Sequence, residues 1–114
     1  ITVTIALNYG GHNDILQAAS AWAQMCAQKG IAPSMEAAEE YFSQFLMTAD
    51  IPDPDIMIRT SGEQRVSNFL LWQSAYTEMF FTDTFWPDFS KADLEGIIRS
   101  YNTRERRFGA VSAK

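Results

Sequence analysis

The fold is decided by residues 52–89, which read PDPDIMIRTSGEQRVSNFLLWQSAYTEMFFTDTFWPDF. Near the start of this stretch, a short apolar run predicts a strand at residues 55–58, with Arg59 at its carboxyl end. Residues 60–68 then combine hydroxyls, a glycine, a carboxylate and a second arginine, which indicates a polar loop. An aromatic segment follows, and a further apolar run predicts a second strand at residues 78–82.

Two arginines in this region contrast with an otherwise acidic chain. Arg59 and Arg65 are, together with Lys29, the only lysines or arginines among the first ninety residues, which contain eleven acidic residues. A guanidinium presents a planar set of N–H donors that matches two oxygens of a phosphate group at once. The loop therefore predicts an anion site, and a diphosphate is an anion that would suit two such groups.

Other groups around the loop could belong to the same site. Ser67 offers a hydroxyl donor, and backbone N–H groups near Gly62 offer more donors. Glu78 could serve a divalent cation, because Mg²⁺ prefers one or two carboxylates together with phosphate oxygens. The alternative is that both arginines are structural and pair with nearby carboxylates, for which the candidates are Glu63, Asp53 and Asp55.

The amino-terminal part of the chain predicts a strand, a tight turn and a helix. Residues 1–7, ITVTIAL, are uncharged and rich in β-branched residues, which suits a strand buried on both faces. Gly10 and Gly11 permit a tight turn into a helix at residues 12–29, which Gly30 is expected to end. In α/β folds, ligands bind where such a turn follows the carboxyl end of a strand.

Two further helices are expected. Ser34 is a candidate cap for a helix over residues 34–47, and Ser90 or Asp93 starts a last helix that runs into the arginine-rich end. In the first helix, Asp14 lies in the first turn, where its charge suits unpaired N–H groups. Helices that alternate with strands predict an α/β fold with a mainly parallel sheet.

Composition narrows the class of protein. The net charge is −5, and five of the nine cations lie in the last sixteen residues, so nucleic-acid binding is not expected. The only cysteine, Cys26, excludes an internal disulfide, fits a reducing compartment and is expected to be a buried, inert thiol. No run approaches the roughly 20 apolar residues that cross a bilayer. Because Ile1 opens on a strand-like pattern without an initiator methionine, we expect residues 1–114 to be a single partial domain of a longer chain.

Long motifs resemble those of the cis-prenyltransferases, the family that includes undecaprenyl and dehydrodolichyl diphosphate synthases. Residues 58–89 resemble the signature of the carboxyl-terminal half of that family. Residues 5–11, IALNYGG, followed by DI at 14–15, resemble an upstream block. Tyr101 with RERRFG at 104–109 resembles the closing helix, so the similarity covers nearly the whole chain.

The resemblance implies a Rossmann-like, mainly parallel sheet flanked by helices, and a homodimer or a pair of related subunits. It implies Mg²⁺-dependent condensation of isopentenyl diphosphate onto an allylic diphosphate such as farnesyl diphosphate, with new cis double bonds. Glu78 would help to hold Mg²⁺, the aromatic segment after Asn68 would be a dimer interface, and the final arginines would reach the partner's site. The residues that would bind isopentenyl diphosphate are Arg59, Arg65, Val66 and Ser67.

The resemblance also shows departures and a missing part. His12 stands where most relatives have arginine, and Gln64 stands where some have a histidine near the metal. The catalytic aspartate loop and the product tunnel would lie upstream of Ile1, so no catalytic residue is expected here, and the chain alone is predicted to be inactive. The alternative is a non-catalytic partner subunit of a cis-prenyltransferase complex. Peripheral membrane contact, in the cytoplasm or a plastid, is the family expectation.

Overall fold

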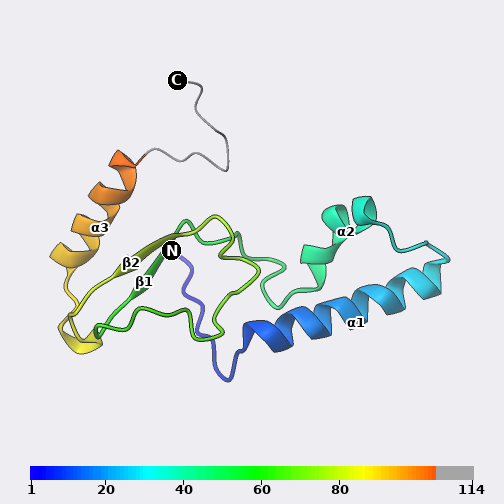
Figure 1. Ribbon diagram of the computed structural model, residues 1–114, viewed down its shortest axis with the longest axis horizontal. Helices are drawn as coiled ribbons and strands as arrows, with labels where there is room; N and C mark the ends of the chain where they lie inside the picture. Colours follow the sequence, from blue (N-terminus) through cyan, green and yellow to red (C-terminus); the bar gives the residue numbers. More distant parts are fainter. Residues whose placement is uncertain (105–114) are drawn as a thin grey trace. The chain divides into compact units, whose positions relative to one another are not determined.

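The computed structural model describes residues 1–104, and Figure 1 shows the order of their elements. The elements are α1 (Gly11–Lys29), α2 (Met35–Tyr41), the 3-10 helix η1 (Phe42–Phe45), β1 (Ile56–Arg59), β2 (Glu78–Phe81), the 3-10 helix η2 (Trp86–Asp88) and α3 (Lys91–Thr103). The chain divides into two compact units. The helical unit is Ile1–Asp53 with Val66–Trp72, and the sheet unit is Pro54–Arg65 with the chain from Gln73 onward.

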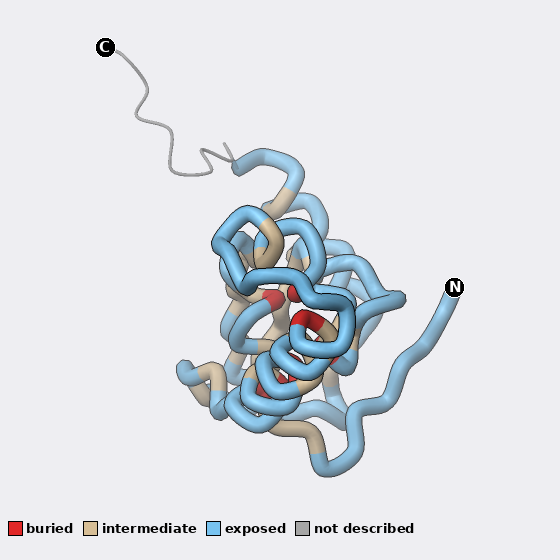
Figure 2. The backbone as a smooth tube through the Cα atoms, turned by 90° about the vertical axis from the view of Figure 1, so that its right-hand side faces the viewer, coloured by how far each residue is buried: buried red, intermediate tan, exposed pale blue. Residues whose placement is uncertain are grey.

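The helical unit has a small core between α1 and η1. Ala18 on α1 is buried with Phe42 and Leu46, and Trp22 meets the Phe42 ring edge-on with ring centroids 6.2 Å apart. Cys26 is 3% exposed, as predicted from its place in the apolar pattern. In Figure 2 only short stretches of the tube are coloured as buried, so this core covers a small part of the chain.

The two ends of α1 are stabilised in different ways. Gly30 adopts a left-handed conformation with φ 64°, and its N–H donates to the Cys26 carbonyl, so it ends α1 as predicted. At the start, no side chain caps α1 from its own N-cap position, which is Gly10. Asp14 lies in the first turn of α1, as predicted, and its carboxylate also accepts hydrogen bonds from the Tyr9 hydroxyl and the Met47 N–H, both at 2.8 Å.

The predicted strand at residues 1–7 is not present. The side chains of Val3, Ile5 and Leu7 are 79%, 76% and 84% exposed, and the N-terminal stretch is drawn as exposed in Figure 2. A strand buried on both faces needs neighbouring strands to accept and donate its hydrogen bonds. Within residues 1–104 no such ladder forms with this segment, so the β-branched pattern alone does not make it a strand.

The helix predicted over residues 34–47 is shorter and divided. Ser34 is its cap, as predicted, because its hydroxyl accepts from the Ala37 N–H at 3.2 Å. The α-helical part ends at Tyr41, and the chain continues as η1. The Met47 N–H, which would continue a helix, donates to the Asp14 carboxylate instead.

The sheet unit contains a parallel pair of strands, as predicted. β1 and β2 pair in the register Ile56 with Glu78 and Arg59 with Phe81. The pairing is extended at both ends by backbone bonds, from the Glu78 N–H to the Asp55 carbonyl and from the Thr82 N–H to the Arg59 carbonyl, each 3.0 Å long. The α/β fold with a parallel sheet is therefore confirmed.

Helix α3 begins after Ser90, one of the two predicted starts. The Ser90 hydroxyl accepts from the Asp93 N–H, and the Asp93 carboxylate accepts from the Ser90 N–H, which is a capping box. The predicted continuation of this helix into the arginine-rich end, residues 105–114, lies outside the described residues. Among residues 1–104, no helix has the length and apolar character needed to cross a membrane.

Candidate anion-binding site

Arg59 is placed where ligands bind in parallel sheets. It is the last residue of β1, it is half-buried, and its carbonyl accepts from the Thr82 N–H. In the part of the chain that the structure describes, no carboxylate lies within ion-pair distance of the Arg59 guanidinium. Ligands of open parallel sheets bind beyond the carboxyl ends of the strands. A half-buried cation at this position is therefore suited to an anionic ligand.

The loop after β1 is fixed by its backbone. The Ser61 N–H donates to the Thr84 carbonyl at 2.9 Å, and the Gly62 N–H donates to the Thr82 carbonyl at 3.0 Å. The Ser61 and Gly62 N–H groups therefore have backbone acceptors, so any donors from this loop to a ligand would be other N–H groups near Gly62. Gly62 has φ 72°, and a Cβ there would lie 3.2 Å from an Asp83 carboxylate oxygen. Backbone hydrogen bonds and this close approach therefore hold the loop against the segment after β2.

Arg65 forms an ion pair with Glu63, one of the carboxylates named in the structural alternative. Both side chains are exposed to solvent, at 66% for Arg65 and 38% for Glu63. Exposed ion pairs contribute about 0–1 kcal/mol, because water already solvates both charges. A diphosphate with several charged oxygens can compete with one carboxylate for this guanidinium. Asp55, another named candidate, accepts a hydrogen bond from the Tyr101 hydroxyl at 3.1 Å.

Val66 and Ser67 belong to the helical unit, whereas Arg59, Arg65 and Glu78 belong to the sheet unit. Ser67 and the following Asn68 have φ values of 53° and 62°, in the left-handed region that non-glycine residues rarely adopt. The Ser67 side chain is exposed. The structure thus presents the predicted hydroxyl donor on a turn of unusual conformation.

Glu78 occupies the other end of the strand pair from Arg59. It begins β2 opposite Ile56, and its carboxylate accepts from the Arg104 guanidinium at 2.6 Å. That guanidinium also lies over the Phe80 ring, 4.5 Å from the ring centroid. Of the final arginines that were expected to reach a partner, Arg104 therefore contacts its own chain, and Arg106 and Arg107 lie outside the described residues.

Few side chains among the described residues could coordinate Mg²⁺. No group of three or more histidine, cysteine, aspartate or glutamate side chains in residues 1–104 could hold a metal. Glu78 could supply one carboxylate, which is compatible with Mg²⁺ only if phosphate oxygens and water complete the coordination. Its pairing with Arg104 would compete with that role.

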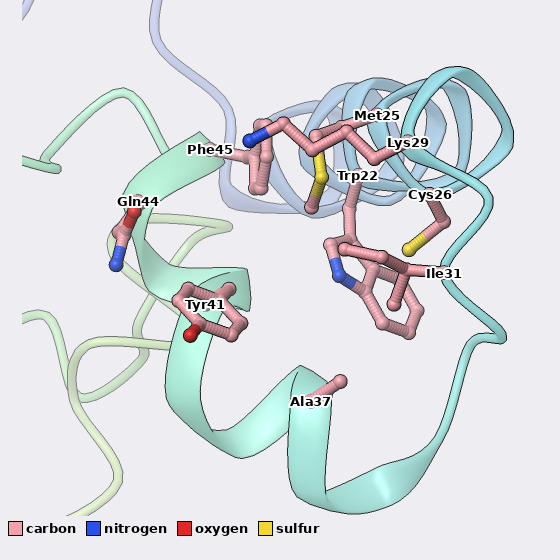
Figure 3. A pocket seen from close by; sticks show the side chains of 9 residues that line it. All are labelled: Trp22, Met25, Cys26, Lys29, Ile31, Ala37, Tyr41, Gln44 and Phe45. Carbon is pink, nitrogen blue, oxygen red and sulfur yellow. The ribbon is translucent and has the colours of Figure 1, made fainter.

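A pocket of about 270 Å³ in the helical unit is distinct from these residues. Figure 3 shows side chains from α1 and from the α2–η1 segment, including Trp22, Met25, Tyr41 and Phe45, facing this space. Lys29 is its one charged lining residue. Such a mainly apolar lining does not suit a diphosphate, and none of the predicted site residues lines it.

Reasoning from the sequence missed the long-range contacts of two side chains in the helical unit, Asn68 and Asp14. Asn68 accepts from the Gly11 N–H through its carbonyl at 2.6 Å and from the His12 N–H through its side-chain oxygen at 2.8 Å. Asp14, at 1% exposure, links the Tyr9 loop to the segment after η1. The available signal was a pair of glycines at the start of the helix: a glycine at the N-cap has no side chain to accept from the first N–H groups, so these need an acceptor from elsewhere.

Comparisons with known proteins identify the family. Residues 1–109 match the sequence model of a family described as putative undecaprenyl diphosphate synthase. The chain is 50% identical over 111 residues to an isoprenyl transferase of Heliobacterium mobile, covering 97% of this chain and 42% of that protein. It is 51% identical over 111 residues to a Vibrio cholerae ditrans,polycis-undecaprenyl-diphosphate synthase described as (2E,6E)-farnesyl-diphosphate specific, covering 97% of this chain and 44% of that protein.

Solved structures agree with these sequence matches. Lavandulyl diphosphate synthase from Lavandula x intermedia, in complex with dimethylallyl diphosphate, matches with a TM-score of 0.80 and 45% identity over 91% of this chain and 44% of that chain. A probable undecaprenyl diphosphate synthase from Campylobacter jejuni matches with a TM-score of 0.72 and 35% identity. The chain spans less than half the length of the relatives it matches. On this fold, these motifs and these matches, the chain belongs to the cis-prenyltransferase family.

Proposed function

We propose that this chain supplies the isopentenyl-diphosphate-binding part of a cis-prenyltransferase that extends an allylic diphosphate such as farnesyl diphosphate. The observation that carries the proposal is Arg59, a half-buried guanidinium at the carboxyl end of β1 that has no carboxylate partner among residues 1–104. A cation that is partly removed from water without a counter-charge is unfavourable. A bound diphosphate would offset that cost.

The other predicted residues have complementary roles in this proposal. Arg65 would exchange its exposed ion pair with Glu63 for a bidentate contact with phosphate. Ser67 would add a hydroxyl donor, and Val66 would contribute its backbone. Together these groups would hold isopentenyl diphosphate so that its double bond faces the allylic carbon, which lowers the barrier by positioning the reactants.

Magnesium belongs to the proposal with a limited role for this chain. Glu78 would give one carboxylate ligand after release from Arg104, and the ion would neutralise diphosphate charge. The proton-removing and diphosphate-leaving steps are assigned to residues outside this sequence. Dimerisation through the exposed aromatic segment after Asn68 and peripheral membrane contact also remain proposals.

A chimera tests the proposed function. This chain would replace the segment it matches in the Vibrio cholerae synthase, and condensation of radiolabelled isopentenyl diphosphate onto farnesyl diphosphate would be measured. The chimera should be active. Arg59→Ala should raise the KM for isopentenyl diphosphate about 10-fold or more, because a hydrogen bond to a charged group contributes roughly 1.5–3 kcal/mol.

The matched control is Arg99→Ala, which removes an exposed arginine of α3 that is assigned no role in the site. It should leave both KM values within about two-fold of the parent chimera, since isolated exposed charges contribute little. A folded chimera without condensation activity would favour the non-catalytic partner subunit. Activity with an unchanged isopentenyl diphosphate KM in Arg59→Ala would refute the assignment of Arg59.

A further inference from the structure

The start of α1 is capped by a residue 56 positions away from it in the sequence. The first N–H groups of a helix have no partner within the helix and need an external acceptor. Here the Gly11 N–H donates to the Asn68 carbonyl at 2.6 Å, and the His12 N–H donates to the Asn68 side-chain oxygen at 2.8 Å. Asn68 therefore satisfies two of these donors, one with its backbone and one with its amide.

The two glycines before and at the start of α1 make this approach possible. A Cβ at Gly10 would lie 2.9 Å from the Asn68 side-chain nitrogen. A Cβ at Gly11 would lie 2.8 Å from Leu71 Cγ and 3.0 Å from the Leu71 backbone nitrogen. Gly10 itself has φ −143°, which any residue can adopt, so the requirement for glycine at this position is one of space.

The segment that Asn68 anchors has an uncommon backbone. Ser67 and Asn68 have φ 53° and 62°, and Leu70 has φ 46°. Residues other than glycine hold such conformations only where surrounding contacts determine them. Asparagine tolerates the left-handed region better than most residues, which suits it to this position. The two bonds to the start of α1 are contacts of the kind that would keep the turn, and with it Ser67, in place.

We propose that Asn68 is a positioning residue for Ser67: by capping α1 it fixes the turn that presents the Ser67 hydroxyl to a diphosphate. The proposal rests on the proposed function, in which Ser67 binds isopentenyl diphosphate. Asn68 acts through its contact with α1, and Ser67 alone of the two touches the ligand. Loss of the side-chain bond therefore weakens isopentenyl diphosphate binding while the catalytic residues stay as they are.

The first experiment uses Asn68→Gly in the active chimera. Glycine keeps the positive φ and the backbone carbonyl but removes the side-chain acceptor for the His12 N–H. We expect the KM for isopentenyl diphosphate to rise about five- to ten-fold, with kcat and the KM for farnesyl diphosphate within about two-fold. A general loss of structure would change all three constants, which would contradict the positioning role. Asn102→Gly, an exposed asparagine of α3, controls for the substitution itself.

Gly10→Ala perturbs the same contact from the other side without changing Asn68. The new methyl group would displace the Asn68 amide, so the KM for isopentenyl diphosphate should rise in the same selective way. The double variant Gly10→Ala/Asn68→Gly should have a KM for isopentenyl diphosphate within about two-fold of the higher of the two single-variant values, because both substitutions break the same hydrogen bond. An additive effect in the double variant, or no effect of Gly10→Ala, would overturn the proposal.

Ser67→Ala separates a failure of this inference from a failure of the proposed function. If Ser67→Ala leaves the KM for isopentenyl diphosphate unchanged, the role of Ser67 fails and this inference fails with it. If Ser67→Ala raises that KM and Asn68→Gly does not, only the inference fails. If Asn68 acts through Ser67, adding Asn68→Gly to Ser67→Ala should change the KM by less than about two-fold.

Discussion

Replacement of Asp14 by alanine should strongly destabilise the helical unit. The Asp14 carboxylate is 1% exposed and accepts from the Tyr9 hydroxyl and from the Met47 N–H, each at 2.8 Å. It thereby connects the loop before α1, α1 itself and the segment after η1. Asp14→Ala removes the acceptor and leaves the Met47 N–H and the Tyr9 hydroxyl without this partner in a partly buried place.

The magnitude follows from the two bonds. Hydrogen bonds to a charged group contribute roughly 1.5–3 kcal/mol each, so the loss of both should lower the free energy of unfolding by about 3–6 kcal/mol. In a chain of this size, each kcal/mol corresponds to a shift of roughly 4 °C in Tm. The Tm should therefore fall by about 12–24 °C. Tyr9→Phe, which removes one bond but keeps the ring contact with Phe69, should cost about 1.5–3 kcal/mol.

Urea unfolding followed by tryptophan fluorescence is a suitable assay, because Trp22 and Trp72 both contact Phe42 in the same unit. Glu39→Ala is the matched control, since it removes an exposed carboxylate from α2 and should change the free energy by less than about 0.5 kcal/mol. The reasoning is refuted if Asp14→Ala destabilises no more than Glu39→Ala. It is also refuted if Tyr9→Phe costs as much in the Asp14→Ala background as in the parent chain.

Three further predictions concern the rest of the chain. Hydrogen bonds from the Ser90 hydroxyl and, to a lesser extent, from the Ser90 backbone N–H lower the pKa of Asp93. The stabilisation of α3 by the Asp93 carboxylate should therefore be complete above about pH 4 and be lost as the pH falls through the lowered pKa. Asp93→Asn should flatten this acid dependence of helicity, measured by circular dichroism. Arg104→Ala should reduce stability by less than about 1 kcal/mol, yet lower the Mg²⁺ concentration needed for half-maximal activity of the chimera, whereas Glu78→Ala should raise it; equal responses of the two variants would contradict a metal role for Glu78. The 114-residue chain alone should give no radiolabelled condensation product, and measurable turnover would show that the site is complete without further sequence.

The sequence predicted helix ends and strands well where they depend on residues that lie close together in the chain. Gly30 ends α1 because its left-handed conformation lets its N–H reach the Cys26 carbonyl, and Ser34 and Ser90 cap α2 and α3 through their own hydroxyls. The strands at β1 and β2 were visible as short apolar runs. Each of these features depends on residues within a few positions, which periodicity and caps can reveal.

Features that depend on distant partners were missed. Residues 1–7 have a strand-like composition, but a strand requires a neighbour, and none pairs with them within residues 1–104. The division of the second helix at Tyr41 accompanies a bond from Met47 to Asp14, 33 positions earlier. For the candidate site, the sequence indicated Arg59 at a strand end, but it could not decide between ion pair and ligand site for Arg65, whose Glu63 contact depends on side-chain conformation.

The contact between Asn68 and the start of α1 changes the interpretation of the two sequence blocks that carried the family resemblance. Gly10 and Gly11 were expected to form a tight turn of the kind beside which ligands bind, and the atoms that a Cβ would meet there belong to Asn68 and Leu71. The N–H groups of Gly11 and His12, which could attract an anion, already donate to Asn68. In this chain, then, Gly10 and Gly11 make room for the turn at Ser67 and Asn68, and in the proposed function the charges that would meet a diphosphate are those of Arg59 and Arg65. A substitution at Gly10 or Gly11 should therefore change substrate affinity through the backbone of the turn, even though no atom of these glycines needs to touch the substrate.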